Sequence, residues 1–211
     1  AEAISAVTAL LPQNITVFAF DFLGCGHSDG EYISLGGHEV DQVRFVIDYL
    51  RKTNRVSRLG LWGRSMGAAT ALMYASHDSD IEALVLDSPF SNLRDLAGEI
   101  AKDCMRIPRM ISSVGLSVVR KTIMKKVGFD INDVNPIDRL ENSYAPAIFL
   151  TSEDDTFIPP HHTKKLHDYY PGEKRLIMVD GDHNSYRPDS FYEEASDFFK
   201  ANLKNDFLID E

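Results

Sequence analysis

Ser65 lies between two glycines, in the sequence Gly63-Arg64-Ser65-Met66-Gly67. The apolar residues before this sequence predict a β-strand, and the small residues after it predict a helix. A G-x-S-x-G pattern at such a junction is typical of a sharp turn that lifts a reactive serine out of the backbone. A serine hydroxyl is a poor nucleophile until a neighbouring base takes its proton, so the chain must supply that base elsewhere.

His183 is the candidate for the base. It follows the last predicted strand, Lys174–Asp180, in the sequence Asp180-Gly181-Asp182-His183-Asn184. Functional residues of a parallel sheet gather at the carboxyl ends of its strands, where His183 could reach Ser65. A carboxylate must then hold the imidazole in the correct tautomer and stabilise its protonated form. The order serine, acid, histidine along the chain is that of the α/β-hydrolases.

Three acidic residues are candidates for the carboxylate. Asp154 and Asp155 follow the predicted strand Ala147–Thr151, and Asp87 ends the strand that comes after the serine. The spacing alone does not separate Asp154 from Asp155. We interpret Asp87 as a structural residue that caps the turn through Ser88-Pro89-Phe90.

The elements that must position these residues alternate between strand and helix. This alternation predicts an α/β domain with a mostly parallel sheet, right-handed crossovers and helices on both faces. We treat residues 1–211 as one domain, in which 91–128, helical in character, form a small helical cap. The predicted strands are Ile15–Asp21, Arg58–Trp62, Ile81–Asp87, Ala147–Thr151 and Lys174–Asp180, and the main predicted helices are Gly37–Thr53, Gly67–Ser76, Pro159–Tyr170 and Asp189–Leu203.

The composition limits the classes of protein. With 211 residues, 44% of them hydrophobic, the chain has enough apolar material for one globular core. A net charge of -10 argues against nucleic acid as a partner, because phosphate binding needs a basic face. Cys25 and Cys104 provide neither a disulfide framework nor a metal-binding spacing, which indicates a reducing compartment, so we expect a cytoplasmic protein. The sequence contains no apolar run of the roughly 20 residues that cross a bilayer.

We expect neither a cofactor nor a metal ion. His161, His162 and His167 have no cysteine nearby and no carboxylates at a ligand spacing. Gly24-Cys25-Gly26 lacks the third glycine of a dinucleotide-binding loop.

Most of the chain resembles the serine-aminopeptidase-like group of the α/β-hydrolase superfamily, which includes depalmitoylating enzymes. The resemblance implies that Asp155 is the acid, because in this group the acid precedes an x-hydrophobic-Val/Ile-Pro sequence, here Thr156-Phe157-Ile158-Pro159. Ser152 stands where the group usually has glycine. The stretches that carry the resemblance are FAFDFLGCGHSDGEYISLG, RLGLWGRSMGAATAL, LVLDSPFSNL, FDINDVNPID, EDDTFIPPHHTKKL and DGDHNSYRP.

The resemblance also implies how the oxyanion of the reaction is held. The Met66 backbone N–H would be the first donor. The second donor of the family comes from a His-Gly loop after an earlier strand, and this chain contains neither. That strand would lie between Ile15–Asp21 and Arg58–Trp62, so we expect N-terminal strands to be missing here and further residues to precede Ala1 in the native protein.

We therefore expect a serine hydrolase that cleaves an ester or thioester through an acyl-enzyme, with Ser65, His183 and Asp155 as its triad. The alternatives are an aminopeptidase-like amide hydrolase and a non-catalytic binding protein of the same fold. Phe90 and Phe157 are candidates for the substrate pocket by position. The expected substrate is a small acyl ester or an acylated protein. The cap could contact an acidic protein or membrane surface through its basic residues Arg106, Arg109, Arg120, Lys121, Lys125 and Lys126.

Overall fold

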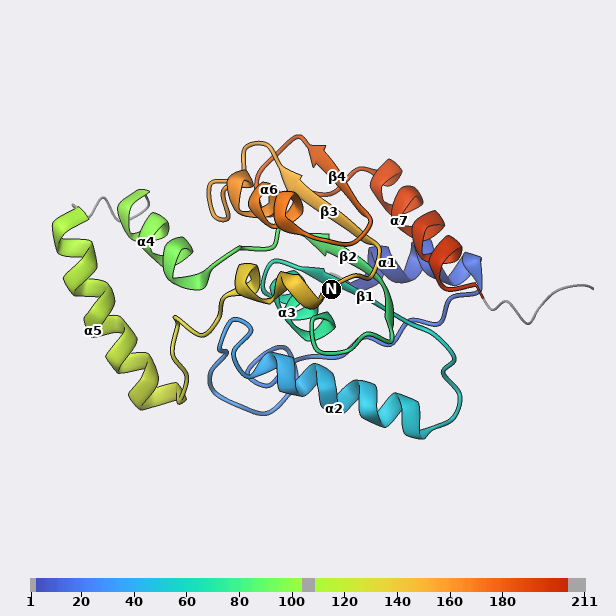
Figure 1. The fold of residues 1–211 in the computed structure, drawn as a ribbon, viewed down its shortest axis with the longest axis horizontal. Helices are drawn as coiled ribbons and strands as arrows, with labels where there is room; N and C mark the ends of the chain where they lie inside the picture. The colour runs from blue at the N-terminus through green and yellow to red at the C-terminus, as the bar shows by residue number, and fades with distance from the viewer. Residues whose placement is uncertain (1–2, 104–108, 205–211) are drawn as a thin grey trace, which may run out of the picture.

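The computed structural model describes residues 3–103 and 109–204, and its centre is a parallel sheet of four strands (Figure 1). The strands are β1 (Leu59–Arg64), β2 (Ile81–Asp87), β3 (Ala147–Ser152) and β4 (Lys174–Val179), and they are hydrogen-bonded in that order. Parallel neighbours require crossover connections, and each connection here carries helical segments. The α/β fold with a parallel sheet is confirmed.

Helices cover both faces of this sheet. The sheet residues alternate between two clusters, because successive side chains of a strand point to opposite faces. The helices of the described residues are α1 (Ala3–Leu10), α2 (Glu39–Lys52), α3 (Met66–Ala75), α4 (Leu93–Asp103), α5 (Arg109–Val127), α6 (Pro160–Tyr169) and α7 (Asp189–Asn202), with 3-10 turns at Leu11–Gln13 and Pro136–Asn142. Leu84 and Phe149 pack with α3 and α6, whereas Val85 and Ile148 pack with α1 and α7.

The predicted strand Ile15–Asp21 is wrong as a strand. The segment has no regular secondary structure and forms no ladder with any strand of the described residues. Its apolar, β-rich sequence favours extension, but a strand exists only where a neighbour pairs with its backbone. Ile15 and Val17 pack against the core, while Phe18 is 51% exposed. Pairing of this segment with β1 would have contradicted the expected missing strand between them. The two do not pair, so the missing strand stays a prediction.

The segment predicted as a cap contains two helices, α4 and α5. Figure 1 shows both to one side of the sheet, with α5 outermost. Leu93 and Leu96 of α4 pack on Ala69 and Met73 of α3. Arg106 lies outside the described residues, and the role of the segment as a cap stays a prediction. Across the described parts of the chain, each helix is too short or too polar to span a bilayer.

Candidate active site

The turn that carries Ser65 joins β1 directly to α3. Ser65 has φ 54° and ψ -120°, a conformation that costs a non-glycine residue energy and that is found at strained functional turns. A Cβ atom on Gly63 would lie 2.2 Å from the carbonyl oxygen of Gly67, so the turn can form only with glycine at position 63. A Cβ atom on Gly67 would meet no described atom within 4 Å. The two glycines of the pattern therefore differ in how strongly the turn needs them.

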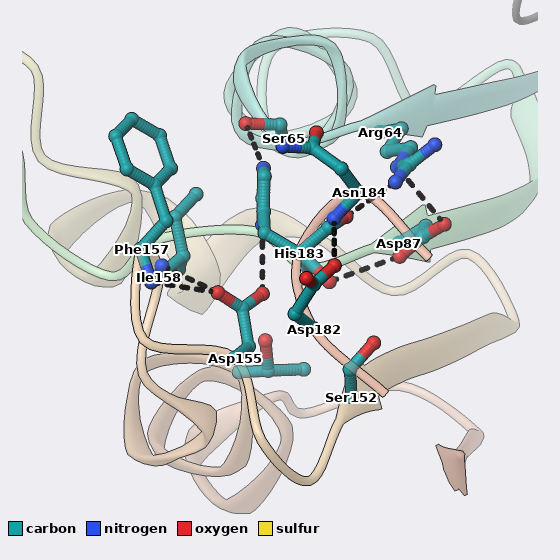
Figure 2. A network of polar contacts seen from close by, with 12 residues as sticks. Arg64, Ser65, Asp87, Ser152, Asp155, Phe157, Ile158, Asp182, His183 and Asn184 are labelled. Carbon is teal, nitrogen blue, oxygen red and sulfur yellow. Dashed lines mark hydrogen bonds and ion pairs between the residues drawn. The ribbon is translucent and has the colours of Figure 1, made fainter. Parts of the chain in front are cut away.

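Ser65, His183 and Asp155 meet at the carboxyl ends of the strands, as Figure 2 shows. The Nε2 atom of His183 lies 3.1 Å from the Ser65 hydroxyl oxygen, and its Nδ1 atom lies 2.7 Å from Oδ2 of Asp155. These three residues come from positions 65, 155 and 183 of the chain, after β1, β3 and β4. The structure brings together the three residues that the sequence and the resemblance singled out.

The partners of Asp155 fix the direction of these hydrogen bonds. Its Oδ1 atom accepts the backbone N–H groups of Phe157 at 3.0 Å and Ile158 at 2.7 Å. A carboxylate can only accept, so Nδ1 of His183 donates to Asp155 and Nε2 keeps the lone pair that faces Ser65. Asp155 and His183 are both buried, which strengthens these bonds. The arrangement can accept a proton from the hydroxyl and stabilise the imidazolium that results.

The other predicted site residues lie in different surroundings. Met66 is the first residue of α3, so no carbonyl within the helix accepts its N–H, which the helix dipole makes more positive. The Phe157 ring is 50% exposed and its centroid lies 5.2 Å from that of the His183 ring. Phe90 is only 2% exposed and packs in the cluster beneath α4. Phe90 is thus a core residue here, and its contact with a substrate stays a prediction.

Arg187 is the residue of this site that the sequence analysis missed. Its guanidinium donates two hydrogen bonds to Asp87, of 2.9 Å to Oδ2 and 2.8 Å to Oδ1, and both side chains are buried. It also donates to the backbone carbonyl of His183 at 3.4 Å and of Ser185 at 3.2 Å. Arg187 therefore holds the loop that carries His183 against the end of β2.

Asp87 is a structural residue, as interpreted, but its main partner is an arginine rather than the following turn. It accepts a hydrogen bond from the Ser88 hydroxyl at 3.0 Å and lies 3.7 Å from Nε of Arg64, its partner in the β1–β2 register. Arg64 also donates to the carbonyl of His183. Figure 2 shows Arg64 and Asp87 beside the His183 loop. Two guanidinium groups thus connect one buried carboxylate to the backbone of the candidate base.

Ser152, the departure from the family pattern, belongs to the same network. Its hydroxyl accepts a hydrogen bond of 2.7 Å from Nη1 of Arg187. A glycine at this position would leave that nitrogen without this partner. The signal in the sequence was the serine itself, but its partner lies 35 residues further along the chain, so the pairing could not be derived from spacing.

Asp182 stabilises the exposed side of the loop that carries His183. Its Oδ1 accepts the Asn184 N–H at 2.9 Å and the Ser185 hydroxyl at 3.0 Å. These hydrogen bonds stabilise the carboxylate and lower the pKa of Asp182. The loop is therefore fixed on both sides of His183.

A group of side chains at the start of α6 has the residue types that bind metal ions. Within the described ranges 3–103 and 109–204, ligand atoms of Glu99, His161 and His162 lie within 4.8 Å of one another. Nδ1 of His162 accepts the backbone N–H of Ser91 at 3.3 Å, so the proton of the neutral ring is on Nε2, which lies 3.2 Å from Oε2 of Glu99. Hydrogen bonds thus use both nitrogens of His162, and the expectation of no metal site stays a prediction.

The model of a family described as serine aminopeptidase, S33, matches residues 4–125, more than half of the chain. The chain belongs to this α/β-hydrolase family. The family name concerns the group as a whole and does not assign a substrate to this α/β-hydrolase.

Individual relatives are similar at moderate identity. The Bacillus subtilis protein YqkD is 30% identical over 171 residues, which are 79% of this chain and 55% of YqkD. The lysophosphatidylserine lipase ABHD12 of Xenopus tropicalis is 27% identical over 166 residues, 72% of this chain and 38% of the relative. This α/β-hydrolase chain therefore spans less than two thirds of the length of either relative.

Solved structures support the same fold. The esterase Pf2001 of Pyrococcus furiosus superposes with a TM-score of 0.74 at 20% identity, covering 95% of this chain and 76% of the esterase. The superposition shows that the two folds are alike. An identity this low does not assign the chemistry, which has to come from the site.

Proposed function

We propose that this α/β-hydrolase cleaves an acyl ester or thioester through a covalent acyl-enzyme on Ser65. The observation that carries the proposal is the continuous chain of hydrogen bonds from Ser65 through His183 to Asp155, with lengths of 3.1 and 2.7 Å. A serine, a base within hydrogen-bond reach and a carboxylate that orients the base are the parts that nucleophilic acyl transfer needs.

In the proposed reaction, Ser65 Oγ attacks the acyl carbon while His183 Nε2 takes the hydroxyl proton. The carbonyl oxygen becomes an oxyanion, which the Met66 N–H stabilises. The C–O or C–S bond to the leaving group then breaks, and His183 returns the proton to the leaving group. Water attacks the acyl-enzyme in the same way and releases the acid and Ser65. Asp155 stays ionised throughout and stabilises the imidazolium. No step requires a cofactor.

The substrate class is proposed from two kinds of support. The exposed Phe157 ring beside His183 offers an apolar surface to an acyl chain. Proteins similar to this chain include an esterase and a lysophosphatidylserine lipase, which favours esters over peptides by analogy. A small acyl ester or an acylated protein would be the substrate. An amide hydrolase or a binding protein of the same fold is the alternative.

A substrate series tests the proposal. The protein is assayed with p-nitrophenyl esters of increasing chain length, with an acyl thioester and with aminoacyl amides, and Ser65→Ala is the control. The proposal predicts hydrolysis of esters and thioesters that Ser65→Ala abolishes. Faster hydrolysis of amides than of any ester would favour the peptidase. Absence of turnover on every substrate, by folded protein, would favour the binding protein.

A further inference from the structure

Charge is distributed very unevenly along this acidic chain. Residues 104–128 contain six Lys or Arg residues and no Asp or Glu, whereas the other 186 residues contain 16 basic and 32 acidic ones. Most of the basic segment is α5, which packs against α4 at the outer side of the molecule (Figure 1). One protruding helix of a protein with net charge -10 is therefore positively charged.

The described side chains of α5 divide into a packed side and an outer side. Leu116, Ile123 and Val127 are half-buried and lie on one side of the helix, at i, i+7 and i+11. The opposite side carries Val118, which is 60% exposed, with Lys121 and Lys125 three and seven residues later. We call the exposed residues Val118, Lys121, Met124, Lys125 and Lys126 the outer face of α5.

This outer face combines positive charge with exposed apolar side chains. Met124 is 48% exposed, so the face carries two exposed apolar side chains, Val118 and Met124, besides its three lysines. Arg120 is not counted in it because its guanidinium binds Asp130, with Nε 2.7 Å from Oδ1. Exposed lysines alone need no partner, but burial of Val118 and Met124 would remove apolar surface from water, which is favourable.

A second set of apolar side chains lies beside α5. Tyr32 and Ile33 are exposed and line a cavity of about 310 Å³ together with Val119 and Ile123 of α5. The cavity wall is almost entirely apolar. Because Ile123 lies on the packed side of α5, this cavity borders that side and is separate from the outer face.

We propose that the outer face of α5 docks the protein on a membrane surface that contains anionic phospholipid. A basic helix with apolar side chains among its lysines is suited to the interface, where the ammonium groups meet lipid phosphates and the apolar side chains enter the acyl boundary. Each lysine near such a surface contributes about fivefold in partitioning. Anionic lipid repels the acidic remainder of the protein only within a Debye length, which is about 10 Å at 0.1 M salt. This repulsion orients the molecule with α5 toward the lipid.

Sedimentation with vesicles tests this proposal without reference to catalysis. The protein is mixed with vesicles of phosphatidylcholine, with and without phosphatidylserine, at low and high salt. The proposal predicts binding only to vesicles that contain phosphatidylserine, and release by salt. Reversing two charges in Lys121→Glu/Lys125→Glu should weaken binding by more than about 20-fold.

The matched control is Lys164→Glu/Lys165→Glu, which makes the same charge change with two exposed lysines of α6. This control should bind as the unmodified protein does. Val118→Ser should weaken binding while leaving its salt dependence unchanged. Equal loss in both double variants, binding that does not require phosphatidylserine, or no binding by folded protein would overturn the proposal. Turnover of a soluble short-chain ester should be equal in all variants, so a failure of docking is distinguishable from a failure of the proposed hydrolase activity.

Discussion

Arg187 and Asp87 form a buried ion pair through two hydrogen bonds, of 2.9 and 2.8 Å, although 100 residues separate them in the chain. The pair joins the end of β2 to the loop that carries His183, and Arg187 also donates to the His183 carbonyl. The position of the candidate base therefore depends on a buried ion pair whose two residues are not among Ser65, Asp155 and His183.

Arg187→Ala should destabilise the protein and lower kcat. Removing one partner of a buried pair leaves an uncompensated charge and costs about 3–5 kcal/mol. Arg64 remains 3.7 Å from Asp87, so we expect the lower part of that range. Denaturant unfolding measures the loss, and Arg187→Lys should restore only part of it because lysine lacks the planar fork.

The control for this prediction is Arg175→Ala. Arg175 binds Glu194 at 2.7 Å on the surface, with a side chain 60% exposed, and such pairs contribute only about 0–1 kcal/mol. Equal losses for Arg187→Ala and Arg175→Ala would mean that the buried network does not support the His183 loop.

Ser152→Gly tests the hydroxyl that departs from the family pattern. The variant removes the 2.7 Å acceptor of the Arg187 guanidinium, and hydrogen bonds to charged groups are worth about 1.5–3 kcal/mol. Ser76→Ala, which removes a 2.7 Å hydrogen bond to the uncharged Met73 carbonyl, should cost about 1 kcal/mol. Thermal unfolding of the two variants compares them. A larger loss in Ser76→Ala would contradict the role given to Ser152.

The two glycines beside Ser65 should respond differently to alanine. Gly63→Ala places a Cβ atom 2.2 Å from a backbone oxygen, so the turn must distort and Ser65 must move. Gly67→Ala meets no described atom within 4 Å and adds a residue of high helix propensity to α3. We expect Gly63→Ala to lose ester hydrolysis and Gly67→Ala to retain most of it. The reverse order of activities would show that the turn geometry is different.

Stability should fall as the pH decreases through the range in which histidine titrates, and His162 should contribute. Burial lowers the pKa of His162, although Glu99 opposes this and His161 adds to it. In the unfolded chain the ring takes a proton near pH 6.5, while in the folded protein it stays neutral to lower pH. The unfolded state therefore binds more protons, and the contribution of His162 to stability is lost as the pH falls from about 7 toward its folded pKa.

His162→Gln should make the free energy of unfolding less dependent on pH between about 5 and 7. The control is His161→Gln, which removes an exposed neighbour whose effect on the pKa of His162 is smaller than that of burial, so it should change the slope less than His162→Gln does. Unfolding curves measured across this pH range give both slopes. A slope that is the same in the protein and in His162→Gln would contradict this account.

Local information predicted the sheet and singled out Ser65 and His183, whereas only the family resemblance separated Asp155 from Asp154. Strands β1 to β4 each overlap a predicted apolar run, and Ser65, Asp155 and His183 each follow the end of a strand. The segment Ile15–Asp21 was misassigned as a strand because local preference for extension does not supply a partner strand.

The sequence could not predict which side chains are hydrogen-bond partners of one another. Arg187 has no local signal, since its partners Asp87 and Ser152 lie 100 and 35 residues away. The motif alone is also insufficient. Gly26-His27-Ser28-Asp29-Gly30 has the same G-x-S-x-G pattern, but the Ser28 hydroxyl donates to the Asp21 carbonyl at 2.7 Å. The strand-to-helix context, rather than the pattern, distinguishes Ser65.

Labelling with a fluorophosphonate probe, followed by mass spectrometry of the modified peptide, tests the central claim most directly. The account predicts a single label on Ser65 that is absent in Ser65→Ala, unchanged in Ser28→Ala, and slower by about 10⁴-fold in Asp155→Asn. Labelling that persists in Ser65→Ala, or a folded protein that never reacts with the probe, would contradict it.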